Sequence, residues 1–154
     1  MGNRSLILLC EDSREDSFLL RNAFVKAGLS HRVIDVRNGQ QAINYLDGTG
    51  LYTDRQQHPL PDLILIDLKM PLLDGFEVLA WIRQQDGIRG LPVVVLTSSS
   101  EIRDVNRAYA LGANSFFVKE LDFQNTVELS RLLRQYWLQT SLKPESSRTK
   151  RKPV

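Results

Sequence analysis

The chain alternates five short aliphatic runs with longer segments in which apolar residues recur every three or four positions. Such runs predict strands buried on both faces of a parallel sheet, and the longer segments predict the helices that cover those faces. We therefore expect one doubly wound α/β domain built from five strand-helix units. The predicted strands are residues 5–10, 31–36, 62–67, 91–97 and 114–118.

The segments between these runs carry signals for the starts of helices. Ser13 with Asp16 makes a weak capping-box pattern, Asp74-Gly75 opens the third helix, and Ser100 can cap the fourth. These signals predict helical segments that begin near the caps and end at glycines. The expected segments are residues 13–28, 39–48, 74–87, 100–112 and 122–142.

Two segments depart from a minimal design of this kind. The stretch "GTGLYTDRQQHPLP" between the second helix and the third strand is longer than compact strand-helix units need. The last helix has more apolar residues than one sheet-facing stripe requires, with Tyr136 and Trp137 near its end. We expect part of this helix to face a partner.

Charge is spread unevenly along the chain. The sequence has 20 basic and 18 acidic residues, a net charge of +2, of which residues 143–154 carry +4 and residues 1–142 carry −2. The polar, proline-containing end cannot bury enough surface to fold, so we expect a domain over 1–142 and a disordered basic tail over 143–154. Without interleaved aromatic residues the tail predicts no specific nucleic-acid binding.

Cysteine content and hydropathy bear on the compartment. Cys10 is the single cysteine, so it cannot form an internal disulfide, which fits a reducing cytoplasm. No apolar stretch approaches the ~18 residues that span a membrane, and the amino terminus lacks a signal-peptide pattern. We expect a cytoplasmic protein without a membrane contact or a second domain.

Polar side chains close four of the five predicted strands: Glu11 and Asp12, Asp67, Thr97, and Lys119. In a parallel sheet these ends share one edge, so the groups meet in a single cleft. Three carboxylates raise each other's pKa unless a cation lies among them, and carboxylate oxygens are ligands that Mg²⁺ prefers. Because an ionised carboxylate is costly to bury, we expect Asp67 to emerge at the edge rather than to be a buried charge.

This constellation resembles the response-regulator receiver domains of two-component signalling. The acidic pair Glu11-Asp12, the stretch "DLKMPLLDG" that begins at Asp67, the hydroxyl of Thr97 and the ammonium of Lys119 match the family's motifs in order, across residues 5 to 140. The resemblance implies a flavodoxin-like fold with strand order 2-1-3-4-5. It also implies a response regulator rather than an enzyme acting on a separate substrate.

The resemblance further implies a chemistry for the site. Asp67 would accept a phosphoryl group from a sensor histidine kinase, with Mg²⁺ held by Asp12, Asp67 and the backbone carbonyl of Lys69, and with Glu11 acting through water. Lys119 would contact a phosphoryl oxygen. After transfer, Thr97 would move toward the phosphate and Phe116 would turn inward, which changes the face made by the fourth helix, fifth strand and last helix.

Departures from the family's pattern affect how the phosphate is held. The family's lysine is usually followed by a cis proline, but Glu120 follows Lys119, so this loop is either trans and rearranged or strained. Lys69 can pair with Glu11 or screen the phosphate from water, or it can point to solvent. We name Lys69 and Ser99 as positions that tune the phosphate lifetime.

The long loop, the Lys-Glu dipeptide and the aromatic end of the last helix, "LLRQYWL", resemble stand-alone regulators that pair with bacterial, mainly cyanobacterial, phytochrome histidine kinases. That resemblance implies a homodimer and an unknown downstream protein. Three alternatives stay open: a phosphorelay intermediate of another hybrid kinase, a haloacid-dehalogenase-type phosphatase, and a receiver-like protein that binds partners without phosphorylation. The phosphatase alternative is disfavoured because its nucleophile follows the first strand.

Overall fold

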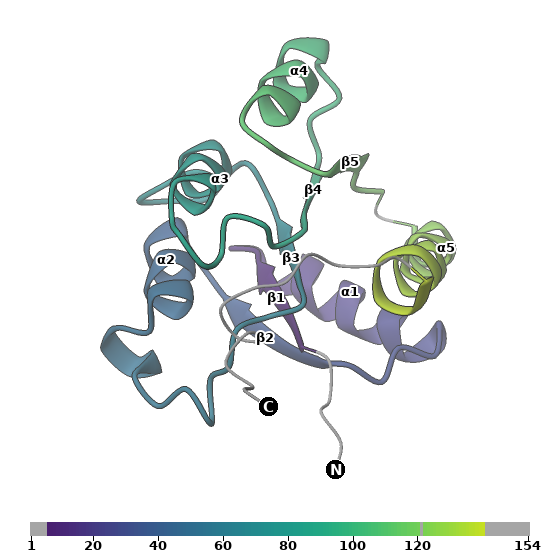
Figure 1. The fold of residues 1–154 in the computed structure, drawn as a ribbon. Helices are drawn as coiled ribbons and strands as arrows, with labels where there is room; N and C mark the ends of the chain where they lie inside the picture. The colour runs from purple at the N-terminus through teal and green to yellow at the C-terminus, as the bar shows by residue number, and fades with distance from the viewer. Residues whose placement is uncertain (1–5, 121, 141–154) are drawn as a thin grey trace.

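The computed structural model describes residues 6–120 and 122–140, which form a five-stranded parallel sheet flanked by helices (Figure 1). The strand order β2-β1-β3-β4-β5 confirms the predicted flavodoxin-like fold. The order reverses between β1 and β3, where open sheets of this type place their sites. The strands are β1 (Leu6–Cys10), β2 (Arg32–Val36), β3 (Leu63–Ile66), β4 (Val93–Thr97) and β5 (Ser115–Val118).

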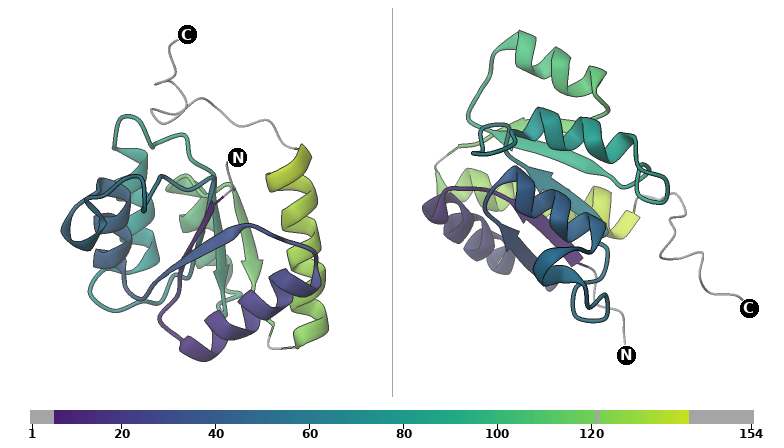
Figure 2. Two further views of the ribbon diagram at one scale, coloured as in Figure 1. Left: turned by 90° about the horizontal axis from the view of Figure 1, so that it is seen from below. Right: turned by 90° about the vertical axis from the view of Figure 1, so that its left-hand side faces the viewer.

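Helices cover both faces of the sheet (Figure 2). Helix α1 packs beside α5 on one face, and α2 packs beside α3 on the other. Within the part of the chain described, no helix is both long and apolar enough to cross a membrane. The helices are α1 (Arg14–Lys26), α2 (Gly39–Asp47), α3 (Gly75–Arg83), α4 (Ile102–Ala110) and α5 (Phe123–Leu133), with a 3-10 turn at Gly50–Tyr52 and a π-helix at Arg134–Thr140.

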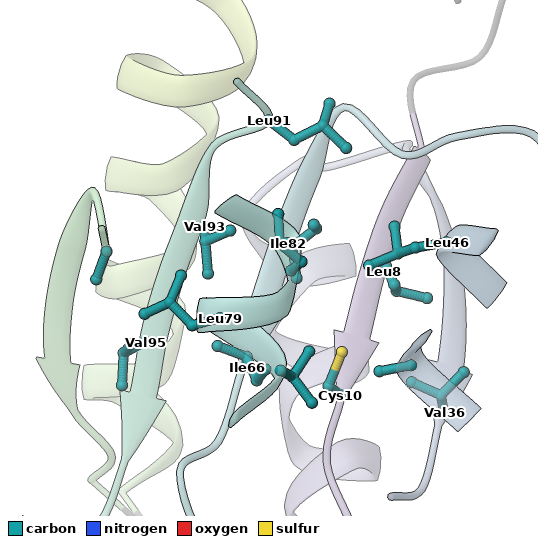
Figure 3. Packing of buried hydrophobic residues seen from close by; sticks show 14 of the residues in the cluster. Leu8, Cys10, Val36, Leu46, Ile66, Leu79, Ile82, Leu91, Val93 and Val95 are labelled. Carbon is teal, nitrogen blue, oxygen red and sulfur yellow. The ribbon is translucent and has the colours of Figure 1, made fainter. Parts of the chain in front are cut away.

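The central strands β1 and β3, and β4 up to Leu96, are apolar and buried because each face of the sheet has its own core. Leu8 and Cys10 of β1 belong to the core beneath α2 and α3, whereas Ile7 and Leu9 belong to the core beneath α1 and α5. Figure 3 shows the first of these cores, in which Leu79 of α3 lies over the strands. The interdigitated aliphatic side chains make the sheet a stable platform for the polar groups at its edge.

One of the predicted helix caps is wrong. Asp74 and Glu77 form a complete capping box at the start of α3, as the sequence predicts. Helix α4, however, has Glu101 as its N-cap, without a side-chain cap hydrogen bond, so Ser100 lies one residue too early. The hydroxyl of Ser99 accepts the Glu101 N–H at 3.3 Å instead.

Two predicted helix ends also differ. Helix α3 ends at Arg83, before Gly87, because the next N–H groups bond three residues back instead of four. Helix α5 ends at Leu133 and continues as the π-helix, and residues 141 and 142 lie outside the described residues, as does the predicted tail over 143–154. Tyr136 is 60% exposed while Trp137 packs against the core, so only part of the expected surplus faces outward.

The long loop between α2 and β3 packs against α2. Tyr45 and Tyr52 have ring centroids 5.0 Å apart, and the His58 ring meets both at steep angles. The Tyr45 hydroxyl donates to the Pro59 carbonyl at 2.7 Å, and the Arg55 guanidinium donates to the Tyr45 carbonyl at 2.7 Å. The loop's extra length is therefore used to build a small aromatic cluster rather than to reach the carboxyl edge.

Candidate functional site at the carboxyl edge of the sheet

Backbone hydrogen bonds carry the parallel register into the residues that follow the strands, and this register gathers the polar side chains. The bonds run from the N–H of Glu11 to the carbonyl of Val36 at 3.0 Å, from Asp67 to Cys10 at 3.0 Å, and from Lys119 to Thr97 at 2.6 Å. The site residues predicted from the strand ends therefore meet at one edge of the sheet.

Three carboxylates form the acidic part of this site. Glu11, Asp12 and Asp67 each offer an oxygen, and these oxygens all lie within 4.8 Å of one another. Glu11 and Asp67 are buried, whereas Asp12 is exposed. Hard oxygen donors with one open side fit a divalent cation of the Mg²⁺ or Mn²⁺ kind, which keeps several waters when bound.

Asp67 is a buried charge, which corrects the expectation that it would emerge at the edge. Its exposed fraction is 7%, and its oxygens are held by the Lys69 backbone N–H at 3.2 Å and the Lys119 ammonium at 3.0 Å. Burial is tolerated because the carboxylate is both paired and hydrogen-bonded. The Lys69 side chain is exposed and makes no ion pair within the described ranges, so the pairing with Glu11, one of the three arrangements open for it, is not formed.

The Lys119 ammonium bridges three carboxylates. Its Nζ lies 2.6 Å from Asp16, 2.8 Å from Glu11 and 3.0 Å from Asp67. Burial disfavours the charged ammonium, but the hydrogen bonds to Asp16 and Glu11 outweigh burial and raise the pKa of Lys119 above its ordinary value. Lys119 is therefore charged at all physiological pH values.

The pKa of Glu11 is also raised, but here burial outweighs the hydrogen bonds. Burial raises the pKa of Glu11 from 4.5 to about 7, and the nearby charge of Asp67 adds to this rise. Hydrogen bonds from Lys119 and from the Ser13 N–H oppose it. The acidic part of the site thus takes up a proton more readily than exposed carboxylates do.

Thr97 is the last residue of β4 and Ser99 follows the strand, but the two hydroxyls differ in their partners. The Thr97 side chain is fully buried, and its Oγ1 has no hydrogen-bond partner among the residues that the structure describes. The Ser99 hydroxyl donates to Asp104 of α4 at 2.6 Å. A buried hydroxyl without a partner is costly, so Thr97 is suited to an acceptor that arrives at the site.

Phe116 and Phe117 of β5 alternate between the two cores, as their positions predict. Phe116 is half-buried against the core beneath α2 and α3, and Phe117 packs against the other core. The peptide bond between Lys119 and Glu120 is trans, since none of the described peptide bonds is cis. The trans loop nevertheless leaves the Lys119 ammonium in the site.

Asp16 is the site residue that sequence reasoning missed. Its position three residues after Ser13 indicated a capping role, and the Ser13 hydroxyl does accept the Asp16 N–H at 3.1 Å. The Asp16 carboxylate, however, turns to Lys119. The available signal was its place in the first turn of the helix that directly follows the Glu11-Asp12 pair, which begins at the same edge of the sheet.

The fold, the three clustered carboxylates and the bridging lysine define a receiver-type site. Residues 7–131 match the response regulator receiver domain family. The chain belongs to this family, which also decides against the haloacid-dehalogenase-type phosphatases. Glu11, Asp12, Asp67 and the Lys119 ammonium lie together in the described site, and the Thr97 carbonyl accepts the Lys119 N–H.

The relatives it resembles include phytochrome response regulators. The chain is 36% identical to response regulator Rcp1 of Synechocystis sp., over 90% of this chain and 92% of that protein. It is also 36% identical to the probable methanogenesis regulatory protein FilR2 of Methanothrix harundinacea, over 86% and 83% of the two chains. These shares leave little of either relative outside the match.

Solved structures agree with this placement. The phosphorylated cyanobacterial phytochrome response regulator RcpA superposes with a TM-score of 0.85 at 33% identity, over 93% of this chain and 100% of that one. The Mn²⁺-bound form of Rcp1 gives a TM-score of 0.80 at 36% identity, over 91% and 99%. The fold of this chain is thus shared with relatives described as phosphorylated or as metal-bound.

Proposed function

We propose that this chain is a response regulator in which Asp67 accepts a phosphoryl group from a sensor histidine kinase. The observation that carries the proposal is the Asp67 carboxylate, buried among Glu11, Asp12 and the Lys119 ammonium. A carboxylate oxygen of Asp67 attacks phosphorus, the bond between phosphorus and the donor's imidazole nitrogen breaks, and the electron pair of that bond stays on the nitrogen, so the imidazole leaves as a neutral ring whose other nitrogen carries the proton. An acyl phosphate remains on Asp67.

The other side chains stabilise the transferred group. The Lys119 ammonium already lies 3.0 Å from Asp67 and donates to a phosphoryl oxygen once one is present. The Thr97 hydroxyl, which has no partner in the buried site, donates to another. Bound Mg²⁺, held by Asp12, Asp67 and the Lys69 backbone carbonyl with Glu11 acting through water, would neutralise charge on the phosphoryl oxygens.

The output surface is the face formed by α4, β5 and α5. As Thr97 moves toward the phosphate, Phe116 turns further inward and α4 shifts, which is a population shift between two packings. Exposed apolar side chains on these elements and on the π-helix that continues α5 support binding to a second copy of the chain or to a downstream protein. They are Ile102, Tyr109, Val118, Phe123, Leu132 and Tyr136.

The partner kinase is proposed to be of the phytochrome type, acting in the cytoplasm. The support is the similarity to Rcp1 and RcpA, one of which is named as a phytochrome response regulator. A relay step from another hybrid kinase would use the same site chemistry. The roles of Lys69 and Ser99 in phosphate lifetime stay predictions.

The proposal is tested by incubating the chain with Mg²⁺ and acetyl phosphate and following its intact mass. We expect a gain of one phosphoryl group. No gain is expected when EDTA is present in place of Mg²⁺ from the start of the incubation. A parallel incubation with a phosphorylated phytochrome-type histidine kinase checks the donor. No mass gain from either donor would contradict the proposed phosphoacceptor.

Stabilisation by Mg²⁺ is expected to grow as pH rises. Because the pKa of Glu11 is about 7 in the folded chain and 4.5 in the reference state, the folded chain binds an extra proton between these values and loses stability as pH rises through them. Mg²⁺ competes with that proton, so its stabilising effect is larger at about pH 8 than at about pH 6. Thermal unfolding with and without Mg²⁺ measures the difference.

Glu11→Gln is the control for this pH dependence. The variant has no proton to lose at this position, so its Mg²⁺-induced shift in Tm should vary much less with pH. Equal shifts at both pH values for the unaltered chain would contradict the role assigned to Glu11.

A further inference from the structure

Asp16 makes the shortest of the three contacts of the Lys119 ammonium. The separation between Asp16 Oδ2 and Lys119 Nζ is 2.6 Å, against 2.8 Å to Glu11 and 3.0 Å to Asp67. An ammonium has three N–H donors, so these three carboxylates occupy all of them. Any contact to a phosphoryl oxygen requires one of the three to be given up.

The three carboxylates differ in what else they must do. The oxygens of Glu11 and Asp67 belong to the cluster that fits a divalent cation, whereas Asp16 lies outside that cluster. Asp16 comes from α1, where its own N–H is bound by the Ser13 hydroxyl at 3.1 Å. Leu20 and Phe24 bury the same helix against the core. Asp16 is therefore a fixed anion on the α1 side of the site.

The backbone alone does not place the ammonium. The Lys119 N–H donates to the Thr97 carbonyl, which sets where the side chain begins, and the following residue is Glu120 in a trans peptide. The long lysine side chain is flexible beyond that point. Its end is positioned by the carboxylates that it meets.

We propose that Asp16 is a positioning residue for Lys119. It holds the ammonium toward α1, which leaves oxygens of Glu11 and Asp67 available to a divalent cation and keeps the ammonium within reach of a phosphoryl group on Asp67. Without Asp16, the ammonium is shared by Glu11 and Asp67 alone and competes with the metal. The phosphoryl part of this inference rests on the proposed function, but the metal part does not.

The test compares Asp16→Ala with Glu15→Ala in the full chain. Both residues are acids in the first turn of α1, so each variant loses the same charge and the same favourable interaction with the helix dipole. Glu15 is exposed, unlike Asp16, whose side chain is 24% exposed in its contact with Lys119. Thermal unfolding of each variant confirms that it is folded.

Calorimetric titration with Mg²⁺ alone is the first readout. We expect Asp16→Ala to bind Mg²⁺ about tenfold more weakly, the effect of losing one charge-assisted hydrogen bond. Glu15→Ala should change the affinity by no more than about twofold, as for an exposed charge. Asp16→Asn keeps an acceptor oxygen without the charge, so its affinity for Mg²⁺ should lie between those of Asp16→Ala and Glu15→Ala. Equal effects of Asp16→Ala and Glu15→Ala would overturn the proposal.

Titration with beryllofluoride, a phosphoryl analogue, at saturating Mg²⁺ is the second readout. The affinity of Asp16→Ala should again fall by about tenfold relative to Glu15→Ala, because the ammonium is no longer held where the analogue binds. Unchanged affinity would overturn the role of Asp16 toward the phosphoryl group. An unaltered chain that binds Mg²⁺ but no beryllofluoride would contradict the proposed phosphoacceptor, while the Mg²⁺ comparison would still decide the role of Asp16.

Discussion

Asp67→Asn is expected to abolish phosphoryl uptake from acetyl phosphate while leaving the chain folded. The amide has nearly the same shape as the carboxylate but lacks the anionic oxygen that attacks phosphorus. Its oxygen can still accept from the Lys119 ammonium or the Lys69 N–H, which bind the carboxylate at 3.0 Å and 3.2 Å. Removing one of the clustered negative charges also relieves repulsion with Glu11. Intact mass after incubation with Mg²⁺ measures the loss.

Asp62→Asn is a matched control at the opposite end of the same strand. The Asp62 carboxylate accepts the Leu6 N–H at 2.8 Å, at the amino end of β3 and away from the site. This variant should gain the phosphoryl mass as the unaltered chain does. A mass gain that persists in Asp67→Asn would assign the modification to another residue and contradict the proposed function.

Gly75→Ala is expected to destabilise the chain by about 2 kcal/mol and to weaken metal binding. A Cβ at this position would collide with the Asp67 carbonyl oxygen and lie 2.8 Å from the Leu68 Cα, both of which are backbone atoms. Alanine gains about 1 kcal/mol of helix propensity over glycine, which is less than the ~3 kcal/mol that overpacking can cost. The backbone of Asp67 must therefore move, and its carboxylate moves with it.

Gly28→Ala separates this effect from a general loss of stability. Gly28 has a φ of +84°, a backbone conformation that strains alanine. A Cβ there would have its nearest neighbouring atom, in the Arg134 side chain, 4.0 Å away. Gly28 is also distant along the chain from the residues of the site. Urea unfolding should show losses in both variants, and Mg²⁺ titration should show a loss in Gly75→Ala alone. Unchanged stability and metal affinity in Gly75→Ala would contradict the close packing described here.

The carboxyl-edge constellation could be predicted from the sequence because each polar residue directly follows an aliphatic run. Strand register in a parallel sheet then brings Glu11, Asp67 and Lys119 together without further information. The trans peptide after Lys119 does not remove its ammonium from the site. Its placement depends on the carboxylates around it, of which the strand pattern indicated Glu11 and Asp67 but not Asp16.

Side-chain partners could not be predicted with the same success. The sequence pattern associated Asp16 with the cap at Ser13, which forms, but did not indicate that its carboxylate pairs with Lys119. For Lys69 it left pairing with Glu11, screening of the phosphate and exposure to solvent open, and Glu11 pairs with Lys119 instead. Several polar groups lie near enough to compete at such an edge. Which pairs form depends on distances of a few tenths of an ångström, which spacing along the chain does not specify.

The sequence by itself determined the order of strands and helices, the residues that close the strands, and the family. Those features depend on local patterning and on motifs, which the linear chain contains in full. Only the tertiary structure decided that Asp67 is buried, that Thr97 has a hydroxyl without a partner, and that Asp16 reaches Lys119. These properties depend on how elements distant in sequence pack together, because burial and hydrogen bonding are set by neighbours in space.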